Sequence, residues 1–395
     1  IMPDDKNNYI PYGLQNISEE DIQAVVKTLR SVNITQGPAV PAFENSIKEY
    51  CGSSYAVAVN SATSALHIAC LALDVGPGDI VWTSPITFVA SANCALYCGA
   101  TVDFVDIDSL SYNLSIGKLS EKLAVAEKKG RLPKVLIPVH LAGQPCNMKE
   151  IAKLAKRYHF KIIEDASHAI GGKYLGKAIG SCEFSDISVF SFHPVKIITT
   201  AEGGIATTND REVAIKLELL RSHGITKDEK TMLHESEGPW YYEQLNLGFN
   251  YRMTDLQAAL GLSQMDRLDD FVSQRHQIIA RYNDLLSNIS VVTPWQYPDG
   301  YSASHLYIIR LDRSYTNVSH REVFETMRHN NIGVALHYMP VYRHPYYKHL
   351  GFSKSGFPEA EKYYSEAISL PMYPSLSEEN QVRIVRTLSL ALGQK

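Results

Sequence analysis

The chain has 395 residues, of which 45% are hydrophobic and 20% are charged. A chain of this length can bury a large core, and we expect a larger and a smaller domain. Thirty-eight basic residues against 42 acidic ones give a net charge of −4 without a basic run, so no nucleic-acid partner is expected. No stretch approaches the ~18 apolar residues of a membrane span, so no membrane partner is expected either.

The cysteines and the first residues bear on the cellular compartment. The six cysteines form no CxxC pair, which predicts free thiols and a reducing cytoplasm. Cys94 and Cys98 could share a helix face, but core packing is the better interpretation, and we expect no metal site. Residues 1–12 are polar and do not look like a signal peptide. A cytoplasmic protein is expected.

The first elements predicted are two helices joined by a turn. Ser18 precedes three acidic residues and an apolar pattern of helical spacing, which predicts a capped helix in an N-terminal arm. Thr35-Gln36-Gly37-Pro38 predicts a turn, and Pro41 lies at the start of a second helix. The residues alone assign this turn no function.

Strands and helices alternate from residue 55 to residue 208. The expected strands are 55–59, 80–83, 102–105, 134–139, 160–164, 187–191 and 204–208, and the expected helices are 64–73, 88–97, 116–128 and 147–158, the last capped by Asn147. This alternation predicts an α/β fold with a mostly parallel seven-stranded sheet covered on both faces. Ligands of such sheets bind beyond the carboxyl ends of the strands, where Asn60, Asp165 and Ser191 are expected.

Three motifs at that edge describe one kind of chemistry. Ser61-Ala62-Thr63 opens a helix with small residues, as a phosphate cradle requires. Asp165 ends an apolar strand, and a carboxylate there can pair with a protonated ring nitrogen. Lys196 follows the apolar strand 187–190, and a desolvated lysine is a candidate Schiff-base nucleophile. Together they predict a pyridoxal 5′-phosphate (PLP) site.

The remainder of the chain predicts a flexible loop and a smaller domain. Residues 226–239 are polar and charged, which is typical of loops that close over active sites. A long helical region is expected from 255 to about 287. Strands at 305–311 and 333–336 and helices starting at 319 and spanning 359–368 and 377–392 predict an α+β unit. We therefore expect an arm and PLP-binding domain at 1–254, and a linking helix with a C-terminal domain at 255–395.

Four blocks in this order resemble the DegT/DnrJ/EryC1/StrS family of nucleotide-sugar aminotransferases along nearly the whole chain. The blocks are Asn60-Ser61-Ala62-Thr63-Ser64-Ala65-Leu66, Glu164-Asp165-Ala166-Ser167-His168-Ala169, Ser191-Phe192-His193-Pro194-Val195-Lys196 and Gly248-Phe249-Asn250-Tyr251-Arg252-Met253. The resemblance implies the aspartate aminotransferase fold (fold type I) with PLP as cofactor.

The resemblance also implies roles for individual residues. Lys196 is the expected catalytic residue. Expected cofactor contacts are Ala62, Thr63, Phe88, Asp165, His168, Ser191 and Asn250, and expected substrate contacts are Tyr12, Val32, Asn33, Ile34, Thr35, His193, His337 and Tyr338. The residues alone leave open that Phe88 is a core side chain and that His168 is structural. Asn250 is expected to reach the cofactor of a neighbouring subunit, which implies a homodimer with shared active sites.

Within the family, the chain looks most like the branch that acts in pseudaminic acid biosynthesis. That branch aminates C4 of UDP-2-acetamido-2,6-dideoxy-β-L-arabino-hexos-4-ulose, and the resemblance implies L-glutamate as the amino donor. The alternatives are amination at C3 or C4 of another nucleotide-linked keto sugar, and a PLP-fold regulator without catalysis. Dehydration, found in relatives with histidine in place of the lysine, is disfavoured because Lys196 is present.

Overall fold

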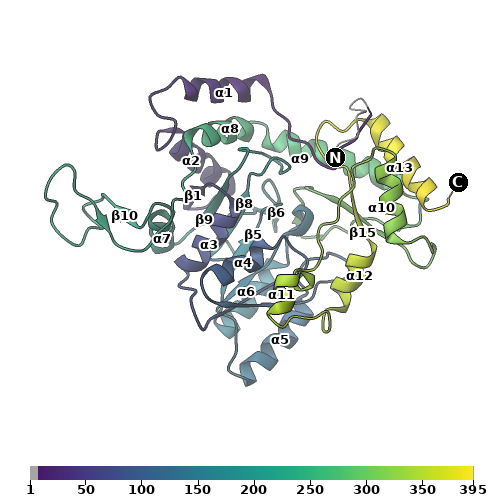
Figure 1. Ribbon diagram of the computed structural model, residues 1–395, viewed down its shortest axis with the longest axis horizontal. Coiled ribbons are helices and arrows are strands. Elements are labelled where there is room, and N and C mark those ends of the chain that lie inside the picture. The colour runs from purple at the N-terminus through teal and green to yellow at the C-terminus, as the bar shows by residue number, and fades with distance from the viewer. Residues whose placement is uncertain (1–7, 395) are drawn as a thin grey trace.

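A computed structural model describes residues 8–394 and contains a seven-stranded sheet (Figure 1). The strand order is β1-β9-β8-β5-β4-β2-β3. The bounds are β1 (Tyr55–Val59), β2 (Ile80–Thr83), β3 (Thr101–Phe104), β4 (Val135–Ile137), β5 (Lys161–Asp165), β8 (Ile187–Ser191) and β9 (Gly204–Thr208). Only β9 runs against its two neighbours, so the other six strands end at one edge. The predicted α/β class is confirmed.

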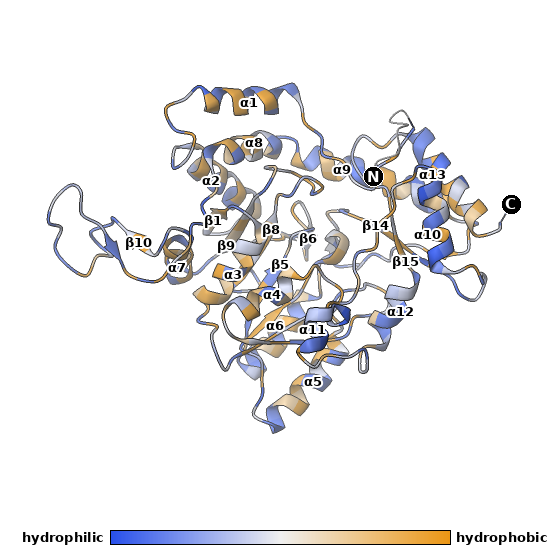
Figure 2. Ribbon diagram, viewed as in Figure 1, coloured by the Kyte–Doolittle hydropathy of each residue, from blue (hydrophilic) through white to orange (hydrophobic). Residues whose placement is uncertain are grey.

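Helices cover both faces of this sheet, as its apolar strands require. Their bounds are α1 (Glu19–Leu29), α2 (Ala39–Cys51), α3 (Ala62–Ala72), α4 (Ala90–Tyr97), α5 (Ile116–Lys128), α6 (Met148–Tyr158), α7 (Arg211–Arg221), α8 (Asp255–Met265) and α9 (Leu268–Leu285), with a short 3-10 turn η1 (Leu141–Gly143). One core joins the sheet to α2, α5 and α6, and a second joins it to α3, α4 and α7. Figure 2 shows the central strands and α3 coloured hydrophobic, and the peripheral α10 and α11 mostly hydrophilic.

A smaller α+β unit follows α9, as predicted. Its sheet has the order β12-β14-β15. Its elements are β12 (Val291–Val292), β14 (Tyr307–Leu311), α10 (His320–His329), η2 (Val341–Arg343), α11 (Pro345–His349), α12 (Pro358–Glu366), β15 (Ala367–Leu370) and α13 (Glu378–Ala391), and its core includes buried side chains of α9, β14 and α13. The boundary between residues 254 and 255 stays a prediction, and α8 packs against α1 and α2.

Three local predictions were wrong. Asn147 does not cap α6 with its side chain, because its Oδ1 accepts a hydrogen bond from the Tyr174 hydroxyl instead. The helix predicted to end at residue 368 ends at Glu366, where pairing with β14 draws the chain into β15. Residues 333–336 form only one bridge, between Ala335 and Ser369. The helical region predicted from residue 255 to about residue 287 is confirmed and consists of two helices, α8 and α9.

Two short sheets complete the fold. The first joins β6 (Lys173–Tyr174), β7 (Lys177–Ala178) and β13 (Gly300–Tyr301), and the second pairs β10 (Ile225–Thr226) with β11 (Glu243–Gln244). Figure 1 shows the segment around β10 projecting at the left. This projecting segment, residues 225–247, exposes Leu233, Trp240 and Leu247. No helix within residues 8–394 is both long enough and apolar enough to cross a membrane.

The N-terminal helix α1 lies along α8 (Figure 1) and is fastened there by one buried carboxylate. Asp21 is fully buried and accepts hydrogen bonds from Ser263, Gln264 and Arg267 of the α8 region, as well as from the Ser18 N–H. Burial alone would raise the pKa of Asp21, but these hydrogen bonds and the charge of Arg267 outweigh it and lower the pKa. The arm is therefore attached by a charge-dependent contact.

Replacing Asp21 should loosen the arm. We expect Asp21→Ala to lower the free energy of unfolding by about 2 to 4 kcal/mol in urea titrations, because four donors lose a buried acceptor. Since the folded-state pKa is lowered, the carboxylate stabilises the fold when ionised, so the difference from wild type should shrink as the pH falls through that pKa. Lys27→Ala on the exposed face of α1 is the control, and an equal effect of both substitutions would contradict this role.

Candidate active site

The main candidate site is a cavity of about 440 Å³ at the edge where β1, β5 and β8 end and β9 begins. The cavity is lined by Tyr12, Ser61, Ala62, Thr63, Leu66, Thr87, Phe88, Ala90, Val139, Asp165, Ser167, His168, Ser191, His193, Val195, Lys196, Glu202, His305, His337 and Tyr338. The smaller unit contributes its last three residues, so the cavity lies between the two parts of the fold.

The amino end of α3 forms one wall. Ser61 caps the helix by accepting the Ser64 N–H at 3.1 Å. The amides of Ala62 and Thr63, in the first turn, have no intrahelical acceptor and are available to an anion. Gly204 of β9 lies so close that a Cβ atom there would be 2.5 Å from the Ala62 nitrogen. The cradle therefore needs glycine at the start of β9.

Asp165 at the end of β5 is held by donors on both carboxylate oxygens. Its Oδ2 accepts the Ser91 hydroxyl at 2.6 Å and its Oδ1 accepts the Ser167 N–H at 3.1 Å. The Ser91 oxygen lies 2.7 Å from the Thr87 hydroxyl, which must be the donor because Ser91 already donates to the carboxylate. With both oxygens held, the Asp165 carboxylate has a fixed orientation, as a partner of a protonated ring nitrogen requires.

Lys196 lies in a loop between β8 and β9, and backbone hydrogen bonds join the two ends of this loop. The N–H groups of Phe192 and Thr200 donate to the carbonyls of Gly203 and Phe192, each at 3.0 Å, and the Lys196 N–H donates to the His193 carbonyl at 2.9 Å. Desolvation lowers the pKa of Lys196 to about 8, although the Asp165 carboxylate opposes this effect. A lysine amine that loses its proton near neutral pH can act as a nucleophile and as a base.

The histidines of the cavity are neutral. His168 Nδ1 accepts the Ala142 N–H at 3.3 Å, and its Nε2 lies 3.1 Å from the Tyr338 hydroxyl. Burial, followed by the charge of Lys196, holds the pKa of His168 well below its ordinary value and lowers that of His337 to about 3. The hydroxyl of Tyr338 is thus the polar group that His168 orients.

Most of the predicted site residues come together in this cavity. Those that line it are Tyr12, Ala62, Thr63, Phe88, Asp165, His168, Ser191, His193, Lys196, His337 and Tyr338. Phe88 is 57% exposed at the rim, its ring centroid 6.2 Å from that of Tyr338. It is therefore not a core side chain.

The remaining predicted residues do not line the cavity. Val32, Asn33, Ile34 and Thr35 are exposed in the segment after α1, and Val32 is 99% exposed. Asn250 is also exposed and is bridged to Ser222. In this chain alone, these five residues face outward.

Sequence reasoning missed three polar groups of the site: Ser91, Thr87 and His305. Ser91 and Thr87 lie near a predicted helix start, but nothing local indicates that their hydroxyls face a strand 74 residues farther along the chain. His305 begins a predicted strand of the smaller unit. Its approach to His168 results from the packing of the two parts of the fold, with ring centroids 4.4 Å apart.

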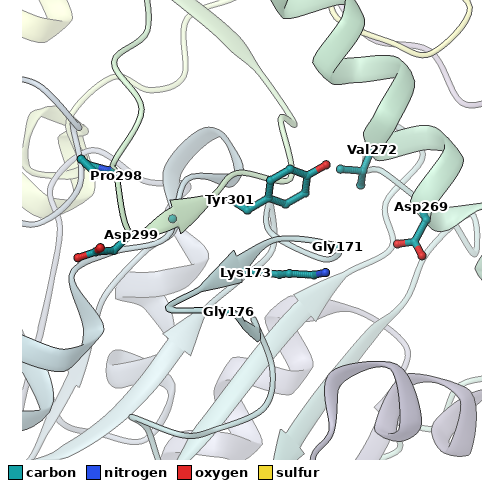
Figure 3. A pocket seen from close by; sticks show the side chains of 9 residues that line it. Gly171, Lys173, Gly176, Asp269, Val272, Pro298, Asp299 and Tyr301 are labelled. Atoms are coloured by element: carbon teal, nitrogen blue, oxygen red, sulfur yellow. The ribbon is translucent and has the colours of Figure 1, made fainter.

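A second hollow of about 480 Å³ lies between the β6 hairpin and α9, and Figure 3 shows its side chains. Two of its lining side chains, Asp269 and Tyr301, contact neighbours within the fold. Asp269 accepts the Tyr50 hydroxyl at 2.6 Å, and the Tyr301 ring stacks on His276 with centroids 4.5 Å apart. None of the predicted site residues lines this hollow.

Comparisons with known proteins agree with the geometry. Residues 15–389 match the model of the DegT/DnrJ/EryC1/StrS aminotransferase family. The chain is 40% identical over 382 residues to the spore coat polysaccharide biosynthesis protein SpsC of Bacillus subtilis, covering 96% of each chain. It is 37% identical over 380 residues to the UDP-4-amino-4,6-dideoxy-N-acetyl-β-L-altrosamine transaminase of Campylobacter jejuni, again covering 96% of each.

Solved structures are similar along the whole chain. PseC of Helicobacter pylori, an aminotransferase of pseudaminic acid biosynthesis, superimposes with a TM-score of 0.88 at 30% identity, covering 98% of this chain and 99% of PseC. A Streptococcus pneumoniae protein described as a sugar aminotransferase, Spr1654, has been solved in a PLP form and superimposes with a TM-score of 0.87 at 31% identity, covering 98% and 99%.

The cavity fits PLP as cofactor. It offers an anion cradle at α3, a carboxylate held by two donors, and a desolvated lysine amine. A phosphate, a ring nitrogen and an aldehyde are the three groups of PLP that need such partners. PLP is the cofactor of the family, and Spr1654 has been solved in a PLP form.

The lowered pKa of Lys196 predicts how the protein takes up PLP. Because only the neutral amine reacts, the rate constant for PLP capture by cofactor-free protein should rise about tenfold per pH unit up to about pH 8 and level off above it. Stopped-flow absorbance measures this rate, and Lys196→Ala, which should lack the fast phase, is the control. A rate that keeps rising to pH 10 would mean an ordinary, solvated lysine.

Proposed function

Because the chain belongs to the DegT/DnrJ/EryC1/StrS aminotransferase family, we propose that it transfers an amino group from L-glutamate to C4 of UDP-2-acetamido-2,6-dideoxy-β-L-arabino-hexos-4-ulose. The product is UDP-4-amino-4,6-dideoxy-N-acetyl-β-L-altrosamine, and the pathway is pseudaminic acid biosynthesis. That the chain is a PLP-dependent sugar aminotransferase follows from the family and its named members. The choice of sugar is supported by full-length likeness to two proteins named for this pathway.

The proposed residues divide the work of the reaction. When bound, PLP supplies an electron sink for the carbon that loses a proton. The amides of Ala62 and Thr63, with Ser191, would hold its phosphate, and Phe88 would lie against its ring. Asp165 would hold the proton on the ring nitrogen, and Ser91 orients that carboxylate. These contacts bind and orient, and they leave proton transfer to another group.

Lys196 is the proposed proton carrier. In the first half-reaction its amine would take the proton from Cα of L-glutamate, and in the second it would deliver a proton to C4 of the sugar. Because its pKa is lowered to about 8, this amine is present in both its neutral and its protonated form near neutral pH. His193, His337, Tyr338 and Tyr12 line the space where the sugar would lie.

We also propose a cytoplasmic homodimer with shared sites. The chain exposes large apolar side chains on three segments, among them Leu29 of α1, Val32 after it and Trp240 and Leu247 of the projecting segment. Exposed apolar groups of this number are typical of an interface. Asn250 and the segment 32–35 would then complete the cavity of the second subunit from outside, as substrate and cofactor contacts in trans.

Another nucleotide-linked keto sugar is the main alternative. It is favoured by the 40% identity to SpsC, which is named for spore coat polysaccharide biosynthesis rather than for pseudaminic acid. A PLP-fold regulator without catalysis is less well supported, because Lys196, Asp165 and the α3 cradle all face one cavity.

The function is tested by supplying both substrates in turn. PLP-loaded protein should lose its visible absorbance on addition of L-glutamate and regain it on addition of the UDP-4-keto sugar, with a 4-amino sugar identified by mass and NMR. Loss of absorbance without recovery would support the aminotransferase activity and exclude this sugar as the substrate. Lys196→Ala should fold, but should neither bind PLP covalently nor complete either half-reaction.

Shared sites predict complementation between two inactive variants. Asn250→Ala and Lys196→Ala should each be inactive as pure proteins. Mixed after dissociation and reassociation, they should regain up to about a quarter of wild-type activity, because half of the molecules would be heterodimers with one intact site of two. The control is a mixture of Lys196→Ala and Asp165→Ala. Both residues line the same cavity of one subunit, so no site of their heterodimer is intact and no activity should return. If both mixtures behave alike, Asn250 does not act in trans.

A further inference from the structure

His305 is a cavity residue to which the proposed mechanism gives no task. It lines the cavity and is 3% exposed. Its N–H donates to the Ala142 carbonyl at 2.9 Å, and its own carbonyl accepts Nη1 of Arg275 at 3.0 Å. Its ring lies against His168, with centroids 4.4 Å apart at 45°. The backbone of His305 is therefore held from both sides of the fold.

The turns that hold His305 are conformationally costly. Ala142 and Ser304 both have φ of 58°, in the left-handed region that non-glycine residues seldom adopt. Between them lies Gly143, where a Cβ atom would be 2.8 Å from the His168 carbonyl and 3.1 Å from the His305 nitrogen. The backbones that carry His168 and His305 therefore lie so close to residue 143 that no side chain fits there.

The polar groups around His305 are unsatisfied as well. Within the described part of the chain, His305 Nδ1 and Arg275 Nε are fully buried without a hydrogen-bond partner. Arg275 gives Nη1 to the carbonyls of Ser304, His305 and Met372, and no carboxylate of residues 8–394 pairs with it. Strain and buried unsatisfied groups that destabilise the free protein are typical of ligand sites.

The protonation of His305 follows from its surroundings. Burial first, then its neighbours His168, Lys196 and Arg275, hold the pKa of His305 well below its ordinary value, so the ring is neutral. A proton on the buried Nδ1 would be a donor without an acceptor, so the proton belongs on Nε2. Among the described residues Nε2 has no hydrogen-bond partner, yet it is not one of the fully buried unsatisfied atoms, so it is the ring nitrogen that reaches the cavity. His305 thus presents an N–H donor there, with the Arg275 cation behind it.

We propose that His305 Nε2–H, backed by Arg275, binds the α-carboxylate of the amino donor. The inference rests on the proposed aminotransferase function. An amino acid carries an anion on the carbon that reacts at Lys196, whereas a nucleotide sugar carries its charge on the diphosphate, remote from C4. No hydrogen-bond acceptor among the described residues takes the His305 Nε2–H, and the Arg275 cation behind it, which donates to the His305 carbonyl, has no carboxylate partner there. A carboxylate at Nε2 would accept that hydrogen bond.

Measuring the two half-reactions separately distinguishes donor binding by His305 from a general role in catalysis. Wild type and His305→Leu are loaded with PLP, and the rate of the L-glutamate half-reaction is followed by cofactor absorbance. We expect kcat/KM for L-glutamate to fall about 10- to 100-fold, as expected for loss of a charge-assisted hydrogen bond. The sugar half-reaction, measured on protein loaded with pyridoxamine phosphate, should change less than about twofold. His305→Gln, which can place a donor near Nε2, should recover part of the loss.

A substrate with an altered carboxylate tests the contact itself. L-isoglutamine has an amide in place of the α-carboxylate, so the preference of wild type for L-glutamate over L-isoglutamine should shrink about tenfold in His305→Leu. Calorimetric titration with 2-methyl-L-glutamate, which has no Cα proton to lose, should show the same weakening without turnover. These measurements need no sugar, so failure of the proposed sugar would leave them intact.

Stability distinguishes binding from a structural role. Because Nδ1 is unsatisfied, His305→Leu should leave Tm unchanged or raise it, whereas a structural histidine would lower Tm on removal. Ser188→Ala is the matched control, since Ser188 Oγ is also buried without a partner but lies in β8 outside the cavity. It should leave both half-reactions unchanged. Equal losses in both half-reactions of His305→Leu, or an unchanged preference for L-glutamate, would overturn the proposal.

Discussion

The site depends on the close approach of β9 to the amino end of α3. Gly204 pairs with Val59 of β1 and with Ser191 of β8, and its Cα faces the Ala62 amide where no side chain fits. Because β9 runs against its neighbours, the segment that carries Lys196 leaves β8 and returns at the same edge. The anion cradle and the lysine are therefore held at a fixed separation by strand pairing. The spacing that a cofactor bridging the two requires is set by the strand pairing at both ends of the loop that carries Lys196.

Charge is distributed unevenly along this cavity. At the β5 end, the Asp165 carboxylate is compensated by Ser91 and Ser167. On the side of the smaller unit, the buried Arg275 lies behind the neutral His305, and Arg275 has no carboxylate partner among the described residues. A ligand with a protonated ring at one end and an anion at the other matches this arrangement. The free protein keeps buried charge that a bound ligand would neutralise, which is the usual compromise between stability and activity.

The strands and the reacting groups could be predicted because their signals are local. The strands of the large sheet are short apolar runs, and Asp165 and Lys196 follow such runs directly. The failures occur where partners are distant in sequence. Asn147 is occupied by Tyr174, β15 exists only because β14 pairs with it, and Ser91 and His305 face the cavity through contacts between separate elements. A local pattern identifies a reacting group, whereas the groups that orient it depend on the assembled fold.

The two substrates place different demands on the chain. An amino acid is small, and a cavity of about 440 Å³ lined by one subunit has room for it beside the cofactor. A nucleotide sugar is larger, so its diphosphate and base must extend past the rim, where Phe88 and His193 are exposed. The exposed segment 32–35 and the projecting segment 225–247 have apolar surface that this chain does not cover. In the proposed scheme, the donor is recognised within one subunit, through groups such as His305, and the sugar nucleotide is recognised by surfaces that a second copy would complete.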